Sequence, residues 1–92
     1  MIQSFRHKAL ERLYETGSPR GIRTDLIAKI ARILSMLDVA SDPQALNLPG
    51  YALHPLKGEL KGFWAVTVKA NWRIVFRFLD GDAYDVELLD YH

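Results

Sequence analysis

Apolar residues in the first half of the chain recur three and four positions apart, which is the spacing of an α-helix with one buried face. One such stripe covers residues 8–14 and ends at Gly17, a natural helix stop. A longer stripe follows Thr24, which suits the N-cap of a helix, and continues to about Val39. Pro43 lies beyond this second pattern and can open one further helical turn. The first half of the sequence therefore predicts two helices.

From residue 51 onward the period changes to two, which is typical of β-strands. The predicted strands cover residues 63–68, 72–78 and 84–88, with a possible fourth at 51–54. Asp80 and Gly81 form a two-residue hairpin signal, because both residues tolerate positive φ. Ahead of the first helix, Ile2 and Phe5 predict a short strand or an extended arm.

These elements predict an α+β fold in which two N-terminal helices pack on a curved antiparallel sheet. The length of 92 residues suits one domain, so residues 1–92 are expected to form it alone. Arg73 alternates out of phase with its apolar neighbours and should point away from the helices. In the last strand, Tyr84, Val86 and Leu88 should share one face. The face expected to lie under the helices carries Trp72, Ile74, Phe76 and Phe78.

The composition is that of an ordinary globular protein, with 49% hydrophobic and 25% charged residues. The absence of cysteine excludes a disulfide framework and a thiolate metal site. No apolar run approaches the ~20 residues that span a bilayer, and the N-terminus lacks a secretion signal, so we expect a cytoplasmic protein without membrane contact. The net charge of +1 conceals basic segments at 1–35 and 54–77. They could form a patch for an anionic partner, although surface charges that alternate in space explain the same balance.

Histidine, tyrosine and carboxylate side chains occur near the predicted strand ends, and such groups can carry protons in acid–base catalysis. His54 lies at the possible fourth strand, and Asp90, Tyr91 and His92 are the last three residues. These residues would meet if the last strand lies beside the strand of His54. Taken singly, each is more often an exposed polar residue, and spacing alone does not show that they converge.

Three cations, Lys57, Arg73 and Arg77, could stabilise a charged phosphate. His7 stands in a basic run ahead of the first helix and is interpreted as solvated. The histidines and acidic residues show no His-x-His, His-x-x-x-His or Glu-x-x-His spacing of the kind that binds metals. We therefore expect no metal and no cofactor.

Several blocks of the sequence together resemble the HigB toxins, the plasmid-maintenance killer branch of the RelE/ParE superfamily. The resemblance covers essentially the whole chain, including Ile2, Ser4, Phe5, His7 and Lys8 at the start. It is weakest over residues 15–50, where only the helical pattern agrees. Further blocks are Leu53-His54-Pro55-Leu56-Lys57-Gly58, Gly62-Phe63-Trp64-Ala65-Val66-Thr67-Val68, Asn71-Trp72-Arg73-Ile74, Gly81-Asp82-Ala83-Tyr84 and Asp90-Tyr91-His92. The blocks that begin at His54 and at Asn71 carry the most weight.

The resemblance implies the RelE-like, microbial RNase fold and a bacterial toxin that cleaves mRNA on the translating ribosome. In such a reaction a ribose 2′-OH attacks the neighbouring phosphate, so a base, an acid and cations are needed. His54 or Asp90 is the candidate base and His92 the candidate acid, while Tyr91 would stack on or orient the nucleotide. Further implied site residues are Arg73 and Lys57 at the phosphate, with Asn71 and Lys61 contacting the RNA.

The implied partners are a HigA-like helical DNA-binding antitoxin, the small ribosomal subunit with its mRNA, and operator DNA bound through the antitoxin complex. Two other functions remain open. One is that of the ParE-like toxins of the same superfamily, which inhibit DNA gyrase and cleave nothing. The other is a non-catalytic RNA- or protein-binding module that uses tryptophan and arginine side chains as contacts.

Overall fold

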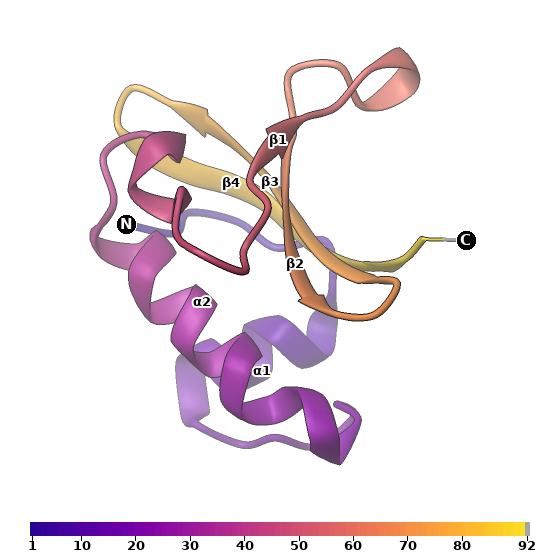
Figure 1. Cartoon of the computed structure of the whole chain (residues 1–92). Coiled ribbons are helices and arrows are strands. Elements are labelled where there is room, and N and C mark those ends of the chain that lie inside the picture. Colours follow the sequence, from indigo (N-terminus) through magenta and orange to yellow (C-terminus); the bar gives the residue numbers. More distant parts are fainter. Residues whose placement is uncertain (92) are drawn as a thin grey trace.

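The computed structural model describes residues 1–91 and contains two α-helices, three short 3₁₀ turns and one four-stranded sheet (Figure 1). The helical elements are α1 (Lys8–Thr16), η1 (Thr24–Leu26), α2 (Ile27–Val39), η2 (Pro43–Leu46) and η3 (Gly58–Leu60). The strands are β1 (His54–Pro55), β2 (Trp64–Lys69), β3 (Trp72–Leu79) and β4 (Asp82–Asp90). All neighbouring strands are antiparallel and follow the order β1-β2-β3-β4.

Both ends of α1 are fixed by local hydrogen bonds. The Nδ1 atom of His7 accepts the backbone N–H of Leu10 at 3.3 Å, so this histidine caps the helix. The expectation of a merely solvated His7 was therefore wrong, because a ring nitrogen can satisfy one of the free N–H groups of the first turn. At the other end, Gly17 adopts φ +77° and its N–H bonds to Leu13 O, which confirms the predicted stop.

The entry into α2 differs from the expected N-cap. Thr24 opens the η1 turn and makes no capping hydrogen bond, because the chain first tightens into a 3₁₀ turn. This turn buries Leu26 and directs Asp25 toward Arg23 and Lys69, which lie 2.6 and 3.2 Å from its carboxylate. The further turn at Pro43 is present as η2.

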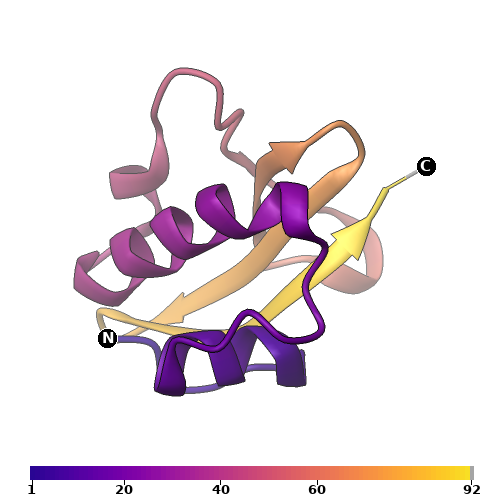
Figure 2. The same cartoon turned by 90° about the horizontal axis from the view of Figure 1, so that it is seen from below.

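The two helices form one layer against a single face of the sheet, as Figure 2 shows. The helices and the sheet share one main core, and Phe76 and Ile74 of β3 are fully buried in it. Trp72 and Phe78 pack at its margin, which confirms the predicted apolar face. Other fully buried members are Leu10, Leu26, Ile30, Ile33, Leu37, Leu46, Val66 and Val86. No helix within residues 1–91 has the length and apolar character needed to cross a membrane.

The N-terminal residues form the predicted extended arm, which lies parallel to β4. Single bridges pair Ile2 with Ala83 and Phe5 with Val86. Backbone bonds from Gln3 N to Ala83 O, at 2.8 Å, and from Arg6 N to Val86 O, at 2.9 Å, support them. The arm thus covers the outer edge of the last strand.

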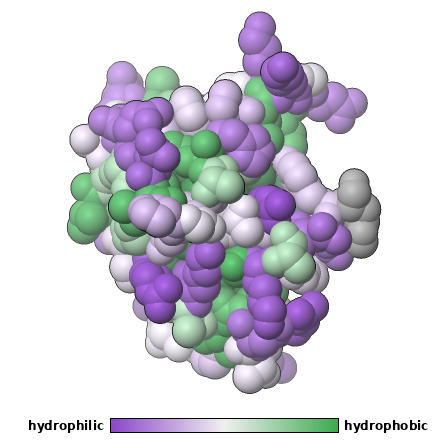
Figure 3. Space-filling model, viewed as in Figure 1, coloured by the Kyte–Doolittle hydropathy of each residue, from purple (hydrophilic) through white to green (hydrophobic). Residues whose placement is uncertain are grey.

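The possible fourth strand is shorter than expected, since β1 contains only His54 and Pro55. Ala52 has φ +49°, which interrupts an extended chain. Tyr51 is buried instead, and its carbonyl accepts the N–H of Thr67 at 2.7 Å. The loop after β1 projects from the sheet, and its tip is hydrophilic in the space-filling view of Figure 3.

A β-bulge changes the pattern expected for β4. The register shifts between Val75 and Arg77 of β3, and Asp85 has φ +55°. Tyr84 therefore pairs with Arg77 on the face away from the helices, whereas Val86 is buried under the arm and the helices. The prediction that Tyr84 shares a face with Val86 was wrong, because one extra residue reverses the alternation.

Candidate active site

The sheet face opposite α1 and α2 is here called the open face. Its members within the strands include His54, Ala65, Thr67, Arg73, Val75, Arg77, Tyr84, Glu87 and Leu89. One row across the four strands joins His54 to Ala65, Val75 and Glu87, and the next row along joins Thr67, Arg73 and Leu89. Two strand spacings and two residue steps separate His54 from Arg73, or about 12 Å between Cα atoms. A nucleotide can contact both side chains across that distance.

His54 is half-buried at the start of β1, and its ring is oriented by the backbone. Its Nδ1 lies 2.8 Å from the carbonyl oxygen of Ala52. A carbonyl only accepts hydrogen bonds, so Nδ1 carries the proton in this contact. In the neutral ring the basic atom is then Nε2. The positive φ of Ala52, which shortens β1, also brings this carbonyl to the ring.

Arg73 extends from β3 beside the turn that joins β2 to β3. Its Nη1 donates to Ala70 O at 2.5 Å and to Trp72 O at 3.1 Å. Both acceptors are neutral carbonyls, so they orient the guanidinium group without cancelling its charge. A fixed positive charge on the open face is suited to an anionic ligand.

The residue that follows β4 is bound to the turn that joins β2 to β3. The N–H of Tyr91 donates to Asn71 O at 2.8 Å. Tyr91 is half-buried and directly follows the last residue of β4. Arg73 and the backbone of Tyr91 are therefore both bound to the segment that joins β2 to β3.

Asp90 is placed differently from these residues. It pairs with Trp72, so strand alternation directs its side chain to the helix side of the sheet. There, the hydrogen bond from Arg23 to Asp25 raises the pKa of Arg23, and the nearby Asp90 carboxylate raises it further. His92 lies outside the described residues. The strand register thus places His54 and Arg73 on one face of the sheet and Asp90 on the other.

The cations Lys57 and Lys61 lie on either side of η3 in the loop between β1 and β2, and both are exposed. A small second core anchors this loop, since Leu56 and Leu60 pack on Phe63 and its neighbours on the open face. The N–H of Leu56 also bonds to Phe63 O at 2.9 Å. The two lysines therefore stand at the margin of the open face rather than within the row of His54.

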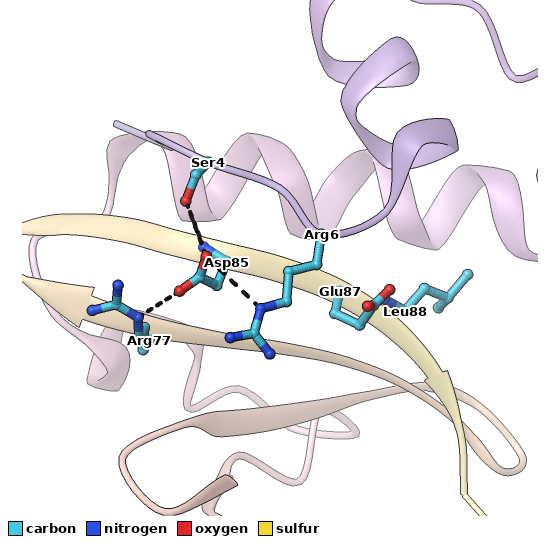
Figure 4. A network of polar contacts seen from close by, with 6 residues as sticks. All are labelled: Ser4, Arg6, Arg77, Asp85, Glu87 and Leu88. Atoms are coloured by element: carbon cyan, nitrogen blue, oxygen red, sulfur yellow. Dashed lines mark hydrogen bonds and ion pairs between the residues drawn. The ribbon is translucent and has the colours of Figure 1, made fainter.

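A polar network that the sequence did not reveal occupies the other end of the open face (Figure 4). The Asp85 carboxylate accepts Arg77 Nε at 2.7 Å and lies 3.8 Å from Arg6 Nε. The Asp85 N–H donates to the Ser4 hydroxyl at 2.9 Å. The sequence had indicated Arg77 as a possible phosphate ligand. It did not link Arg77 to Arg6 and Asp85, because Arg6 and Asp85 are far apart in the chain. Only the bulge and the N-terminal arm bring them together.

A groove between α1 and α2 lies on the helix side, away from the residues above. At its floor the Tyr14 hydroxyl donates to Asp38 Oδ1 at 2.6 Å, and Ile2 N–H donates to the same oxygen at 3.1 Å. The hydrogen bond from Tyr14 lowers the pKa of Asp38, and the N–H of Ile2 lowers it further. Within residues 1–91, no three histidine or acidic side chains gather closely enough to hold a metal ion.

Two solved structures of bacterial proteins have the same fold. A YafQ mutant from E. coli aligns with a TM-score of 0.55 and 16% identity, over 95% of this chain and 89% of that one. A YoeB/ParE toxin from Agrobacterium tumefaciens aligns with a TM-score of 0.53 and 19% identity, over 100% and 99% of the two chains. These likenesses confirm the predicted RelE-like fold.

Sequence comparison gives closer relatives. The chain is 46% identical to a Proteus vulgaris protein named Endoribonuclease HigB, over the full length of both. It is 32% identical to Toxin HigB-1 of Vibrio cholerae serotype O1, over 96% of this chain and 95% of that protein. Residues 3–92 also match the family model of the HigB-like toxins, described as RelE-like toxins of type II toxin–antitoxin systems. The chain therefore belongs to the HigB family of RelE-like toxins.

Proposed function

We propose that this chain is an endoribonuclease that cleaves mRNA on the translating ribosome and thereby arrests bacterial growth. The name of the Proteus vulgaris relative supports an RNA-cleaving activity. The single observation that carries the proposal is the pairing of a general-base candidate with a fixed cation. His54, whose Nε2 is the basic ring atom, shares the open face with the oriented guanidinium of Arg73.

In the proposed reaction, His54 Nε2 removes the proton of a ribose 2′-OH. The 2′ oxygen then attacks the adjacent phosphorus, and the bond from phosphorus to the 5′ oxygen of the next nucleotide breaks. The products are a 2′,3′-cyclic phosphate and a 5′-OH, and His92 supplies the proton of the leaving oxygen. Asp90 was the other candidate base, but its register beside Trp72 favours His54 for this role.

Cations and one aromatic ring complete the proposed site. Arg73 and Lys57 neutralise the extra charge that develops on the phosphate, so no metal ion is required. Tyr91 stacks on a base next to the scissile bond, since aromatic rings are the usual platforms for unpaired RNA bases. Asn71 and Lys61 contact the RNA strand on either side.

The proposed setting is the bacterial cytoplasm, where ribosomes hold the mRNA in place for so small a site. Membership of a type II toxin–antitoxin family implies an antitoxin partner. We propose that it is a HigA-like helical DNA-binding protein, and that the complex of the two represses its own operon by binding operator DNA.

A cell-free translation reaction with primer extension on the mRNA tests the proposal. Purified protein should create new mRNA ends only when ribosomes are present. His54→Ala should lower the cleavage rate by about 10²–10⁴-fold, which is the usual contribution of general acid–base catalysis. Arg32→Ala, on the exposed side of α2, is the matched control and should cleave at the wild-type rate.

Three results would contradict the proposal in different ways. Equal cutting of naked RNA would remove the requirement for ribosomes. Inhibition of DNA gyrase supercoiling without RNA cleavage would instead indicate a ParE-like toxin. RNA binding with neither activity would indicate a non-catalytic module.

A further inference from the structure

We propose that Arg6 and Arg77, held by Asp85, form a second RNA-binding subsite that contacts the phosphate backbone away from the scissile bond. This inference rests on the proposed function, because it assigns the rest of the same open face to the RNA strand. The ligand class is single-stranded RNA, bound through its phosphates without base selection.

The geometry of this arginine pair suits phosphate binding. Each guanidinium group faces a different oxygen of the Asp85 carboxylate through its Nε, at 2.7 Å for Arg77 and 3.8 Å for Arg6. Binding through Nε leaves the terminal Nη nitrogens for another acceptor. Two cations on one carboxylate leave a net charge of +1. The arginine side chains are 50% and 38% exposed, so a ligand can reach them.

Each of the two guanidinium groups also makes a cation–π contact with an aromatic ring. Arg6 lies over the Phe63 ring at 5.1 Å, and Arg77 lies over the Tyr84 ring at 5.3 Å. Cation–π contacts of this kind restrict where a guanidinium group can lie, and the half-exposed side chains stay accessible to a ligand. Glu87, the acidic neighbour in Figure 4, turns its Oε1 to the backbone N–H of Leu88 at 3.1 Å.

The subsite lies on the same sheet face as the proposed active site, and Val75, buried in the second core, separates the two. Arg77 and Arg73 lie on the same face of β3, four residues and therefore about 13 Å apart. They would contact different phosphates of one RNA strand that crosses the open face.

A purely structural role explains the cluster less well. Backbone bonds already hold the arm to β4, including Ala83 N to Met1 O at 3.0 Å and Val86 N to Ser4 O at 3.1 Å. One arginine would satisfy Asp85. Arg6, the more exposed of the two arginines, adds positive charge and is not needed to hold the arm to β4.

The test uses a short single-stranded RNA in which every ribose is 2′-O-methylated, so that it binds but cannot be cleaved. Titration into ¹⁵N-labelled protein is followed through the Nε–Hε signals of the arginines. The signals of Arg6 and Arg77 should shift together with that of Arg73. If only the Arg73 signal moves, or if the RNA does not bind, the proposal fails.

Variants make the test quantitative. Two phosphate contacts on a single strand add about 1.4 to the slope of log affinity against log salt. The affinity advantage of wild type over an Arg6→Gln/Arg77→Gln double variant should therefore shrink about tenfold between 50 and 300 mM salt. An Arg20→Gln/Arg32→Gln variant removes the same charge from exposed helix-side positions and should leave the slope unchanged.

Several outcomes decide between the two proposals and between partners. If both double variants behave alike, or if the arginine pair affects antitoxin binding and not RNA binding, the second subsite is overturned. If wild type binds the RNA through the pair but never cleaves mRNA, the subsite stands and the proposed function falls. Thermal melting checks folding. The single Arg6→Gln variant removes the 3.8 Å ion pair and the contact with the Phe63 ring but keeps the Arg77–Asp85 bond, and it should still lower the slope.

Discussion

Replacing Arg73 with alanine should abolish RNA cleavage and leave the protein folded. Removal of one oriented donor from a site where negative charge develops typically costs ~3–4 kcal/mol of transition-state stabilisation. That energy corresponds to a cleavage rate lowered by about 10²–10³-fold. Arg73→Lys keeps the charge but loses the planar guanidinium and its contacts with Ala70 O and Trp72 O, so it should retain an intermediate rate.

The stability cost should be small because of what the side chain contacts. Arg73 is half-buried, and its acceptors are the carbonyls of Ala70, in an exposed turn, and of Trp72. Water can replace the guanidinium at such carbonyls, so the loss should stay below about 1 kcal/mol. For a chain of this length, that corresponds to a decrease in Tm of less than about 8 °C.

The assay is single-turnover cleavage of a ribosome-bound mRNA, run beside thermal melting of each variant. Arg32→Ala removes an exposed arginine of α2 and controls for the loss of one positive charge. Wild-type cleavage by Arg73→Ala would exclude Arg73 from the site. A large decrease in Tm would mean that Arg73 supports the fold instead.

Three further predictions concern the metal requirement, the C-terminal residues and acid stability. Cleavage should persist in EDTA when sucrose gradients show intact ribosomes, and its loss under those conditions would contradict charge stabilisation by lysine and arginine alone. Deletion of residues 90–92 should abolish cleavage while melting stays near wild type, since among the described residues it removes the end of β4, where Asp90 pairs with Trp72, and the backbone bond from Tyr91 to Asn71. Near-normal cleavage would exclude the terminal residues from the site. Asp38→Asn should flatten the acid dependence of stability measured by urea unfolding at pH 7 and pH 3. The folded-state pKa of Asp38 is lowered by Tyr14, so its contribution is complete above the unfolded pKa of about 4 and is lost as pH falls through the folded value; an unchanged pH dependence would show that this carboxylate contributes nothing.

Periodicity alone was enough to predict both helices, the antiparallel meander and the face that the helices cover. These features depend on which residues are apolar, and the sequence records that directly. The capping of α1 by His7 and the 3₁₀ entry to α2 were missed because several local arrangements satisfy the same helix end. Which arrangement forms depends on tertiary contacts, and at the start of α2 one of these is the contact of Lys69 with Asp25.

The sequence predicted which residues form the candidate site. It could not predict on which face of the sheet each side chain lies, because that depends on strand register. Asp90 was grouped with His54 from its place near a strand end and from the family resemblance, and neither shows that its register partner is Trp72, on the helix side of the sheet. The cluster of Arg6, Arg77 and Asp85 could not be foreseen, because it requires a bulge and an arm that closes on a strand 81 positions away.

The pairing of the N-terminal arm with β4 has a consequence for the time at which the fold can be completed. The arm is synthesised before both helices and all four strands, but its partners Ala83 and Val86 belong to β4, the last of the strands. Contacts between such distant segments form late, because the intervening chain must be brought together first. A nascent chain that ends before residue 83 has no strand on which the arm can dock. The arm can therefore complete the sheet only after the residues up to Val86 have left the ribosome that made them.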